Sequence, residues 1–483
     1  MEKLRSIVAC LKPSEIHLIR DYYQLRKNQG SRRLVLFDLV VEGKVSSDEE
    51  ASLRIFCQPP DSNFSQLKRR LKDDILNILM ICPVEKSYQS ENIKAEFKAR
   101  KMLMQGKILL SRGVYDEGTG ILRKACQLAE KYELSTISLE IQDLLRTHIG
   151  VKKGLEVYKS YQDTIDHNLA DMQMELEAKD LNHRIMIPAL HSAACTGEHA
   201  EAEKLRKIKT HFDSSGSARV GFWYYLSAIR LHINQREFDK AYRYGQQLAS
   251  LIDHEPAIHT VPNRAGIHLE LAKILIHLEQ FPEAITMAQE ARKLFQRGML
   301  NELYAIETLF FAYFRNRQWE QAQAIIEEAT HHKQYQTHIL TPGKWQYFKA
   351  NVSFASRDFD ASLAELHQNT TLKKDRGGWF LGYRILELLN LIEKREYDWI
   401  DSKLESFRKY LQQVQTHQVP RCKNILRLLF ALSKHGFDFQ ATTRDEQGLL
   451  SALSQAKEEN YWDPMGYELV RISDWVNRSA FTS

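Results

Sequence analysis

One short pattern occurs twice between Pro262 and Ala329, and this repetition constrains the fold more than any other feature of the chain. In each copy, apolar residues at helical spacing are followed by a short break, an aromatic residue and, three positions later, an alanine. The aromatic and the alanine are Phe281 and Ala284 in the first copy, and Trp319 and Ala322 in the second. Apolar residues that recur every three or four positions indicate helices with one buried face. Each copy therefore predicts two helices joined by a tight turn.

The same pattern recurs about every 40 residues along most of the chain. The positions that correspond to the turn aromatic are Tyr115, His199, Phe238, Phe281, Trp319, Phe359 and Tyr397, and one more hairpin near Leu155 is expected to fill the long gap. A small residue follows three positions later at Gly118, Ala202, Ala241, Ala284, Ala322 and Ser362, and another precedes the turn by nine positions at Gly106, Ala272 and Ala350. Small residues let the two helices of a hairpin cross closely. Phe310 and Leu388 occupy this second position elsewhere, so those hairpins are expected to pack differently.

A helical hairpin of about 34 residues cannot bury its own apolar face, so hairpins of this kind stack on their neighbours. The pattern is that of the tetratricopeptide repeat. It predicts an all-α fold, in which a right-handed α-α superhelix of about eight hairpins (a tetratricopeptide-like solenoid) follows a small N-terminal helical domain. We expect the domains to span residues 1–85, 86–440 and 441–483. An irregular helical bundle with chance matches is the alternative.

The ends of the chain do not follow the repeat. Near the N-terminus, we expect helices that begin at Ser14 and Asn63 as capping residues. Residues 33–41 are apolar enough for a strand, but we predict a helix because their flanks are helical. At the other end, a helix from Tyr467 to about Asn477 is expected to cap the open end of the repeats. It would bury Leu469, Ile472 and Trp475.

Two regions resemble the tetratricopeptide-like proteins of Bacteroidetes, a family of uncharacterised function. The first region contains Leu11-Lys12-Pro13-Ser14-Glu15, Leu36-Phe37-Asp38 and the helix from Phe64 to Leu79. The second contains Arg384 to Leu389, Tyr397, Ser402 to Leu411 and Asn424. Pro13 and Ile16 depart from the lysine-rich first helix of the family. The resemblance implies helical packing, and it implies no substrate and no catalytic residue.

Composition narrows the class of protein. The 483 residues carry 67 Lys and Arg against 62 Asp and Glu, a net charge of +5, so the charge balance does not by itself imply a polyanionic partner. The six cysteines are scattered without a CxxC pair, as is expected of thiols in a reducing compartment. The first residues lack the apolar core of a signal peptide, and no apolar run is long enough to span a membrane. We therefore expect a cytoplasmic protein.

The sequence offers no catalytic constellation, and we expect neither enzyme activity nor a cofactor nor a metal site. It has no GxxxxGK[ST] or GxGxxG loop and no HExxH motif. The 18 histidines do not fall into sets of three or four at ligand spacing. Cys195 lies four residues after His191, but nothing supplies a third member of a catalytic set, so a packed helix is the preferred interpretation.

A binding surface is the remaining candidate. In this architecture, the position eight residues before the turn aromatic lies on the face of the first helix that lines a groove. Lys107, Arg230, Lys273 and Asn351 occupy that position, and Tyr347 lies nearby. Such a groove predicts a protein or peptide partner that carries an acidic segment or a terminal carboxylate. The alternative is a solvated basic stripe that nearby glutamates balance.

The favoured function is therefore a non-enzymatic scaffold for protein–protein interaction. The alternative is a nucleic-acid-binding regulator that uses the basic helix at residues 63–82, whose candidate contacts are Lys68, Arg69, Arg70 and Lys72. Asp73 and Asp74 follow these residues directly and would repel phosphate groups. An amphipathic helix with a solvated charged face explains the same pattern.

Overall fold

The computed structural model describes residues 1–25, 31–81, 90–190, 198–337, 340–375, 378–414, 419–454 and 460–482. The regular elements in these residues are all helices, with no β-strand among them, which confirms the all-α prediction. The chain divides into two compact units, Met1–Gln89 and Ser90–Ser483. The predicted boundary after residue 85 falls in residues 82–89, outside the described residues. Within the described residues, no helix is both long and apolar enough to cross a membrane.

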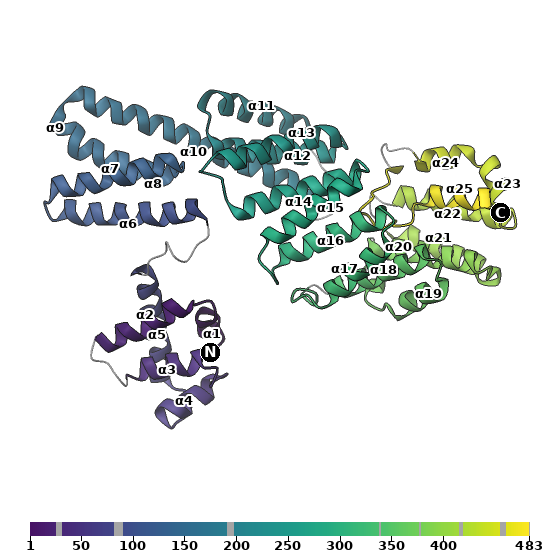
Figure 1. The fold of residues 1–483 in the computed structure, drawn as a ribbon, viewed down its shortest axis with the longest axis horizontal. Coiled ribbons are helices and arrows are strands. Elements are labelled where there is room, and N and C mark those ends of the chain that lie inside the picture. The colour runs from purple at the N-terminus through teal and green to yellow at the C-terminus, as the bar shows by residue number, and fades with distance from the viewer. Residues whose placement is uncertain are drawn as a thin grey trace. The chain divides into compact units, whose positions relative to one another are not determined.

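The first unit is a group of short helices around one apolar core (Figure 1). Residues 33–41 are helical, as predicted, and the Ser31 hydroxyl accepts a hydrogen bond from the Leu34 amide at the start of that helix, at 3.3 Å. Leu36 and Phe37 are fully buried. The helices are α1 (Glu2–Ala9), α2 (Pro13–Leu25), α3 (Arg32–Val41), α4 (Asp48–Phe56) and α5 (Ser62–Ile81).

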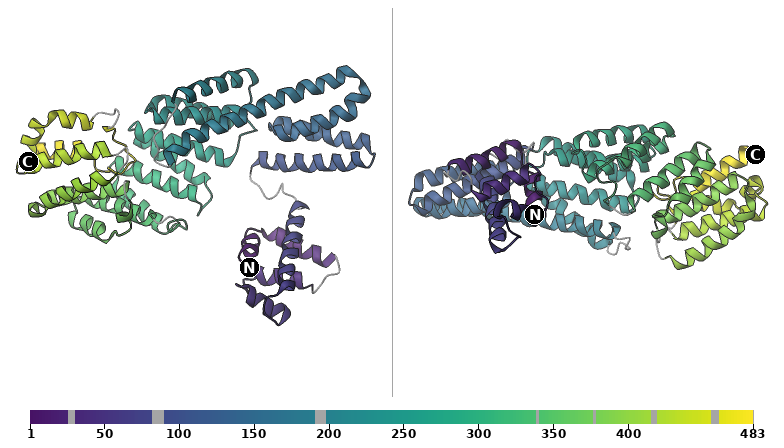
Figure 2. Two further views of the ribbon diagram at one scale, coloured as in Figure 1. Left: turned by 180° about the vertical axis from the view of Figure 1, so that it is seen from behind. Right: turned by 90° about the horizontal axis from the view of Figure 1, so that it is seen from below.

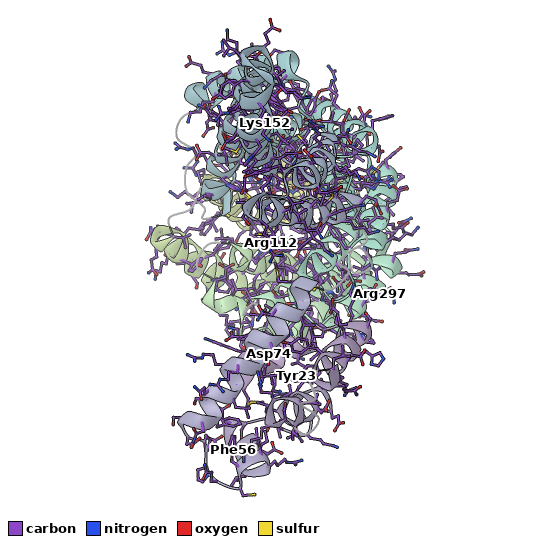
Figure 3. The ribbon with its side chains drawn as sticks, turned by 90° about the vertical axis from the view of Figure 1, so that its left-hand side faces the viewer. Tyr23, Phe56, Asp74, Arg112, Lys152 and Arg297 are labelled. Carbon is purple, nitrogen blue, oxygen red and sulfur yellow. The ribbon has the colours of Figure 1, made fainter. Side chains whose placement is uncertain are left out.

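A polar contact joins three helices of this unit. Asp74 of α5 accepts a hydrogen bond of 2.6 Å from the Tyr23 hydroxyl of α2 and an ion-pair contact of 2.7 Å from Arg33 of α3. Figure 3 labels Tyr23 and Asp74 in this unit. Burial and the neighbouring Asp74 carboxylate raise the pKa of Tyr23, so its hydroxyl stays protonated and donates. Asp74 is thus held by its neighbours within the unit.

Two predicted capping residues are wrong. Helix α2 begins at Pro13, so Ser14 lies inside its first turn, where the Glu15 carboxylate accepts a hydrogen bond from the Lys12 amide. Helix α5 begins at Ser62, and Asp61 is the residue that caps it, since its carboxylate accepts from the Phe64 amide at 2.9 Å. Asn63 instead donates to Asp61. Asp61 and Ser62 are further capping side chains beside Asn63, and local backbone geometry selected Asp61. Before Ser14, Pro13 fits the first turn of a helix, so α2 starts one residue earlier.

The second unit begins with two helical pairs, and the second helix of the second pair is very long. The predicted hairpin near Leu155 is confirmed: α8 leads through a π-helical turn and the short α9 into α10, a 36-residue helix that begins at Leu155 and packs against α8. Helix α10 packs against α8, α11 and α12. The elements are α6 (Glu91–Ser111), α7 (Tyr115–Lys131), α8 (Ser135–Leu145), the π turn η2 (Arg146–Gly150), α9 (Val151–Lys153), α10 (Leu155–Leu190) and α11 (Glu198–Ser215).

Regular hairpins follow, each packed against the next (Figures 1 and 2). One apolar cluster continues from Ala272 to Val476, so the later hairpins share a core, whereas Ala241 and Leu248 of the first hairpin belong to a separate cluster. The helices are α12 (Ala218–Asn234), α13 (Phe238–His254), α14 (Val261–His277), α15 (Phe281–Leu294), α16 (Leu300–Arg315), α17 (Trp319–Thr330), α18 (Thr341–Ala355), α19 (Phe359–Gln368), α20 (Trp379–Glu393), α21 (Ile400–Gln413), α22 (Val419–Lys434), α23 (Phe439–Asp445), α24 (Gln447–Ser454) and α25 (Ile472–Thr482), with 3-10 turns at Leu372–Lys374 and Tyr397–Trp399.

The small residues lie where the pattern predicted. Ala241, Ala284 and Ala322 are fully buried at the starts of their helices. A Cβ atom added to Gly106 would lie 2.6 Å from a Leu122 side-chain carbon, which is too close for any side chain larger than hydrogen. Ala202 is an exception, because it is only partly buried. The close crossing of the helices is therefore the physical reason for the repeated small residues.

The hairpin turns share one backbone conformation. The residue two positions before each turn aromatic has a positive φ. The amide of the residue after it donates to the carbonyl five positions before that amide. This is the hydrogen bond that closes a helix in a Schellman motif. These residues are Arg236 (φ 60°), Glu279 (60°), Arg317 (57°), Arg357 (65°) and Arg395 (59°). Glycine is the usual occupant of such positions. Successive turns therefore present long charged side chains at equivalent places.

The last predicted helix is wrong in its start and in its position. Residues 461–471 consist of turns and irregular backbone, and the helix begins only at Ile472. Leu469, Ile472 and Trp475 are buried as predicted. These side chains are buried because this part of the chain crosses α16, α18 and α20, the first helices of three hairpins.

Candidate binding face on the first helices

The first helix of each hairpin carries the face that the sequence singled out. We use the term first helices for α12, α14, α16, α18, α20 and α22. The predicted groove position lies eight residues before the turn aromatic. Residues four positions to either side of it lie on the same face of a helix. That face therefore includes His277, Arg315 and Glu393, each of which precedes its turn aromatic by four residues.

The three predicted basic residues lie on different helices. Lys107 of α6 is exposed, and its ammonium group is 2.6 Å from the Glu140 carboxylate of α8. Lys273 of α14 is partly buried and 3.9 Å from Glu270. Arg230 of α12 is partly buried and has no ion-pair partner among the described residues. The structure brings none of the three into contact with another, so a shared binding role for them stays a prediction.

The other two predicted groove residues are buried. Tyr347 and Asn351 of α18 are 1% and 0% exposed. The Tyr347 hydroxyl donates a 2.6 Å hydrogen bond to the Tyr467 carbonyl, and the Asn351 amide donates to the Tyr347 carbonyl. Neither side chain is accessible to a separate partner, because the chain's own C-terminal part covers this face.

That covering part, residues 460–475, is named the C-terminal segment from here on. Arg315 of α16 holds its backbone directly. The guanidinium group donates to the carbonyls of Pro464 and Leu469, at 2.8 and 2.6 Å, and to the Glu468 carbonyl at 3.4 Å. It also lies 4.5 Å from the centre of the Trp462 ring. Burial lowers the pKa of Arg315 to about 10, which still leaves it charged at neutral pH.

A histidine binds the beginning of the segment. Nδ1 of His277 lies 2.7 Å from the Tyr461 hydroxyl, and the His277 ring stacks on Phe238 at 4.3 Å. Burial and the nearby Arg315 charge lower the pKa of His277, whereas Asp463 opposes that shift. The imidazole is therefore neutral at pH 7 and can accept or donate one hydrogen bond to the tyrosine.

Later residues of the segment reach α20 and α22. The Trp475 indole donates to the Glu393 carboxylate at 2.7 Å. Gly382 of α20 lies so close to the Tyr467 carbonyl and the Tyr347 hydroxyl that a Cβ atom there would overlap both. In α22, the Cys422 sulfur is 3.0 Å from the Tyr467 hydroxyl. Burial raises the pKa of the Cys422 thiol to about 12, so it is an uncharged packing group and not a nucleophile.

Most of these contacting residues were not picked out from the sequence. His277, Arg315 and Glu393 share a fixed offset from the turn aromatic, and that register could have identified them. Nothing in the sequence indicated that residues 460–471 would lie across this face, since the segment has no periodic pattern of its own. Arrangements of this kind depend on contacts between residues more than 100 positions apart, such as Arg315 and Leu469.

The basic helix of the alternative hypothesis lies in the first unit. Lys68 is 2.5 Å from the Asp48 carboxylate, which also accepts from the Met1 amino group. Arg69, Arg70 and Lys72 are exposed on α5. Of the four predicted contacts, three are therefore accessible and one is held in an ion pair within the unit.

The described residues contain no group of three or more His, Cys, Asp or Glu side chains that could hold a metal ion. The His191 and Cys195 pair lies in residues 191–197, outside the described residues. A comparison of the chain with protein-family models and with curated proteins finds no match.

Proposed function

We propose that Ser90–Ser483 forms a right-handed solenoid of tetratricopeptide-like hairpins, and that it acts as a non-enzymatic scaffold that holds an extended peptide segment across its first helices. One observation carries this proposal. Arg315 and Tyr347 bind the C-terminal segment through its backbone carbonyls, at 2.6 to 2.8 Å for the three shortest contacts.

Backbone recognition of this kind depends little on the sequence of the bound segment. Side-chain donors that hold carbonyl groups supply affinity, and neighbouring pockets supply specificity. The face that holds the C-terminal segment continues in register to Lys273, Arg230 and Lys107 on earlier hairpins. A partner peptide would use the donors of those hairpins in the way that the C-terminal segment uses Arg315.

The test reverses the charge of the three predicted residues in the full chain. The variant combines Lys107→Glu, Arg230→Glu and Lys273→Glu. Partners are captured from native lysate and identified by mass spectrometry. The expected result is the loss of partners that the wild-type chain retains, because reversed charges repel an acidic segment and charge-assisted hydrogen bonds are lost.

A matched control places the same charge change on the second helices of the same hairpins. The control variant combines Lys124→Glu, Lys240→Glu and Lys293→Glu, all at exposed positions of α7, α13 and α15. It should keep the wild-type partners. If both variants keep the same partners as wild type, the first-helix face is not where they bind.

A further inference from the structure

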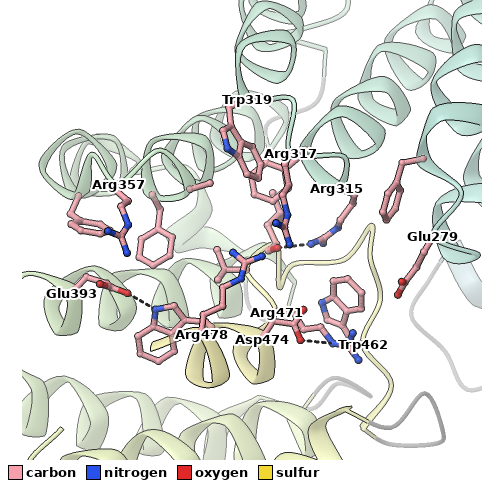
Figure 4. Close-up of a pocket in the computed structure, with 18 residues that line it drawn as sticks. Glu279, Arg315, Arg317, Trp319, Arg357, Glu393, Trp462, Arg471, Asp474 and Arg478 are labelled. Carbon is pink, nitrogen blue, oxygen red and sulfur yellow. Dashed lines mark hydrogen bonds and ion pairs between the residues drawn. The ribbon is translucent and has the colours of Figure 1, made fainter. Parts of the chain in front are cut away.

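A cavity of about 440 Å³ lies between the hairpin turns that follow α14, α16 and α18 and the C-terminal part of the chain (Figure 4). It has the size of a small-ligand site. Aromatic rings form much of its wall, among them Trp319, Phe359 and Trp475. Arginines supply most of its charge: Arg315, Arg317, Arg357, Arg471 and Arg478.

Positive charge exceeds negative charge in this cavity. Its carboxylates are Glu279, Glu393 and Asp474. Glu393 accepts a hydrogen bond from Trp475, and Asp474 lies 3.9 Å from Arg471. Among the described residues, no carboxylate forms an ion pair with Arg315, Arg317 or Arg357.

Like charges repel one another most strongly where protein atoms exclude water, as around Arg315. Arg317 and Arg357 are exposed to solvent, so an anion can reach them directly. Arg315 donates to neutral carbonyl oxygens and lies over the Trp462 ring, and the charges of Asp463 and Glu468 act on it from farther away. An anion that entered the cavity would relieve this repulsion and would find several N–H donors in one place.

The turns deliver these arginines to the cavity. Arg317 and Arg357 both occupy the positive-φ position of their turns, so equivalent backbone geometry points both side chains to the same edge of consecutive hairpins. Figure 4 shows Arg317 and Arg478 reaching toward the middle of the cavity from opposite sides, with Trp319 on one wall. Arg478 belongs to α25, so the C-terminal part of the chain completes the basic lining.

We propose that this cavity binds an acidic side chain of a partner peptide, together with an apolar side chain beside it. The arginines bind the carboxylate, and the aromatic wall takes the apolar neighbour. Glu279 and Asp474 interrupt the basic lining, which disfavours a continuous polyanion such as nucleic acid. The proposal rests on the scaffold function and adds the location and chemistry of one binding site.

The test measures binding to the full chain by fluorescence anisotropy. The probe is a fluorescein-labelled peptide in which glutamate pairs alternate with leucine, and the matched probe has glutamine at every glutamate. The glutamate peptide should bind, and its affinity should fall as salt is added. The glutamine peptide should bind about tenfold more weakly or not at all.

Three single variants locate the site. Arg317→Gln and Arg357→Gln should each weaken binding of the glutamate peptide by about tenfold. Arg395→Gln is the matched control, because Arg395 is exposed, has the same positive-φ turn position (φ 59°) and does not line the cavity. Its affinity should equal that of wild type. Thermal unfolding of all three variants verifies that they are folded.

The cavity proposal would be overturned by equal binding by all three variants and wild type, by an equal loss of binding in Arg395→Gln, or by equal affinity for the two peptides. Tighter binding of single-stranded DNA that displaces the glutamate peptide would also overturn it. None of these results depends on Lys107, Arg230 or Lys273. A failure here is therefore distinguishable from a failure of the partner-capture experiment.

Discussion

Arg421 and Glu468 form a two-point ion pair in the interior of the second unit, with contacts of 2.5 and 3.0 Å between residues 47 positions apart. Their side chains are 4% and 3% exposed. Burial alone would lower the pKa of Arg421, but the Glu468 charge and hydrogen bonds raise it. The pair attaches the middle of the C-terminal segment to the start of α22.

Removal of one partner of this pair should strongly destabilise the second unit. Glu468→Ala leaves a buried guanidinium without its counter-charge, which costs about 3–5 kcal/mol in comparable pairs. Urea unfolding followed by tryptophan fluorescence measures the change. Arg408→Ala is the control, because Arg408 pairs with Glu405 on the exposed surface of α21. If the two variants unfold at the same urea concentration, the interior pair has no special role.

The Tyr467 carbonyl lies so close to Gly382 that we expect any side chain at this position to detach the C-terminal segment. Gly382→Ala places a methyl group against the Tyr467 carbonyl and the Tyr347 hydroxyl. Limited proteolysis should then cut residues 460–471 faster than in wild type. Gly120→Ala is the control, because a Cβ atom there meets nothing within 4 Å. In a helix, that change stabilises by about 0.5–1 kcal/mol. Equal protection of the segment in both variants would contradict the prediction.

The neutral His277 predicts that attachment of the segment weakens in acid. Its folded pKa is lowered, so below the ordinary value of about 6.5 the unfolded chain binds a proton that the folded chain resists. The stability is therefore fully present above that pH and is lost as pH falls toward the lowered folded value. The charged and titratable groups around the ring are Tyr461, Asp463, Arg315, Arg236, Glu279 and Arg471.

Thermal unfolding at about pH 7.5 and about pH 5.5 tests this dependence on the His277 charge. The melting temperature of wild type should fall more between the two pH values than that of His277→Gln, which cannot gain the proton. If the melting temperatures of wild type and His277→Gln fall equally, other groups cause the acid sensitivity.

The α5 hypothesis makes a separate prediction. If Arg69, Arg70 and Lys72 contact phosphates, a gel shift with duplex DNA should weaken with salt, with a logarithmic slope of about −3 for three contacts. The variant Arg69→Glu, Arg70→Glu, Lys72→Glu should abolish it. Lys68 should contribute little, because it is already paired with Asp48. The absence of any shift at low salt would exclude this function.

Helix positions and small residues could be predicted because their causes are local. Apolar spacing located the helices, and the crossing of two helices required Ala284 and Ala322 to be small. Cap residues were harder, since Asp61 and Asn63 are both good capping residues and only backbone geometry distinguished them. Tyr347 and Asn351 were predicted to line an open groove, but they are buried, and the Tyr347 hydroxyl binds the C-terminal segment.

The sequence by itself therefore determined the helical class and the hairpin repeat, because both follow from residues within one or two turns of each other. It also predicted a binding face on the first helix of each hairpin, and the binding role of that face stays a prediction. Only the tertiary structure decided that the C-terminal segment lies across that face and that arginines from separate turns line one cavity. Those arrangements join positions such as Arg315 and Leu469, whose proximity no local pattern encodes.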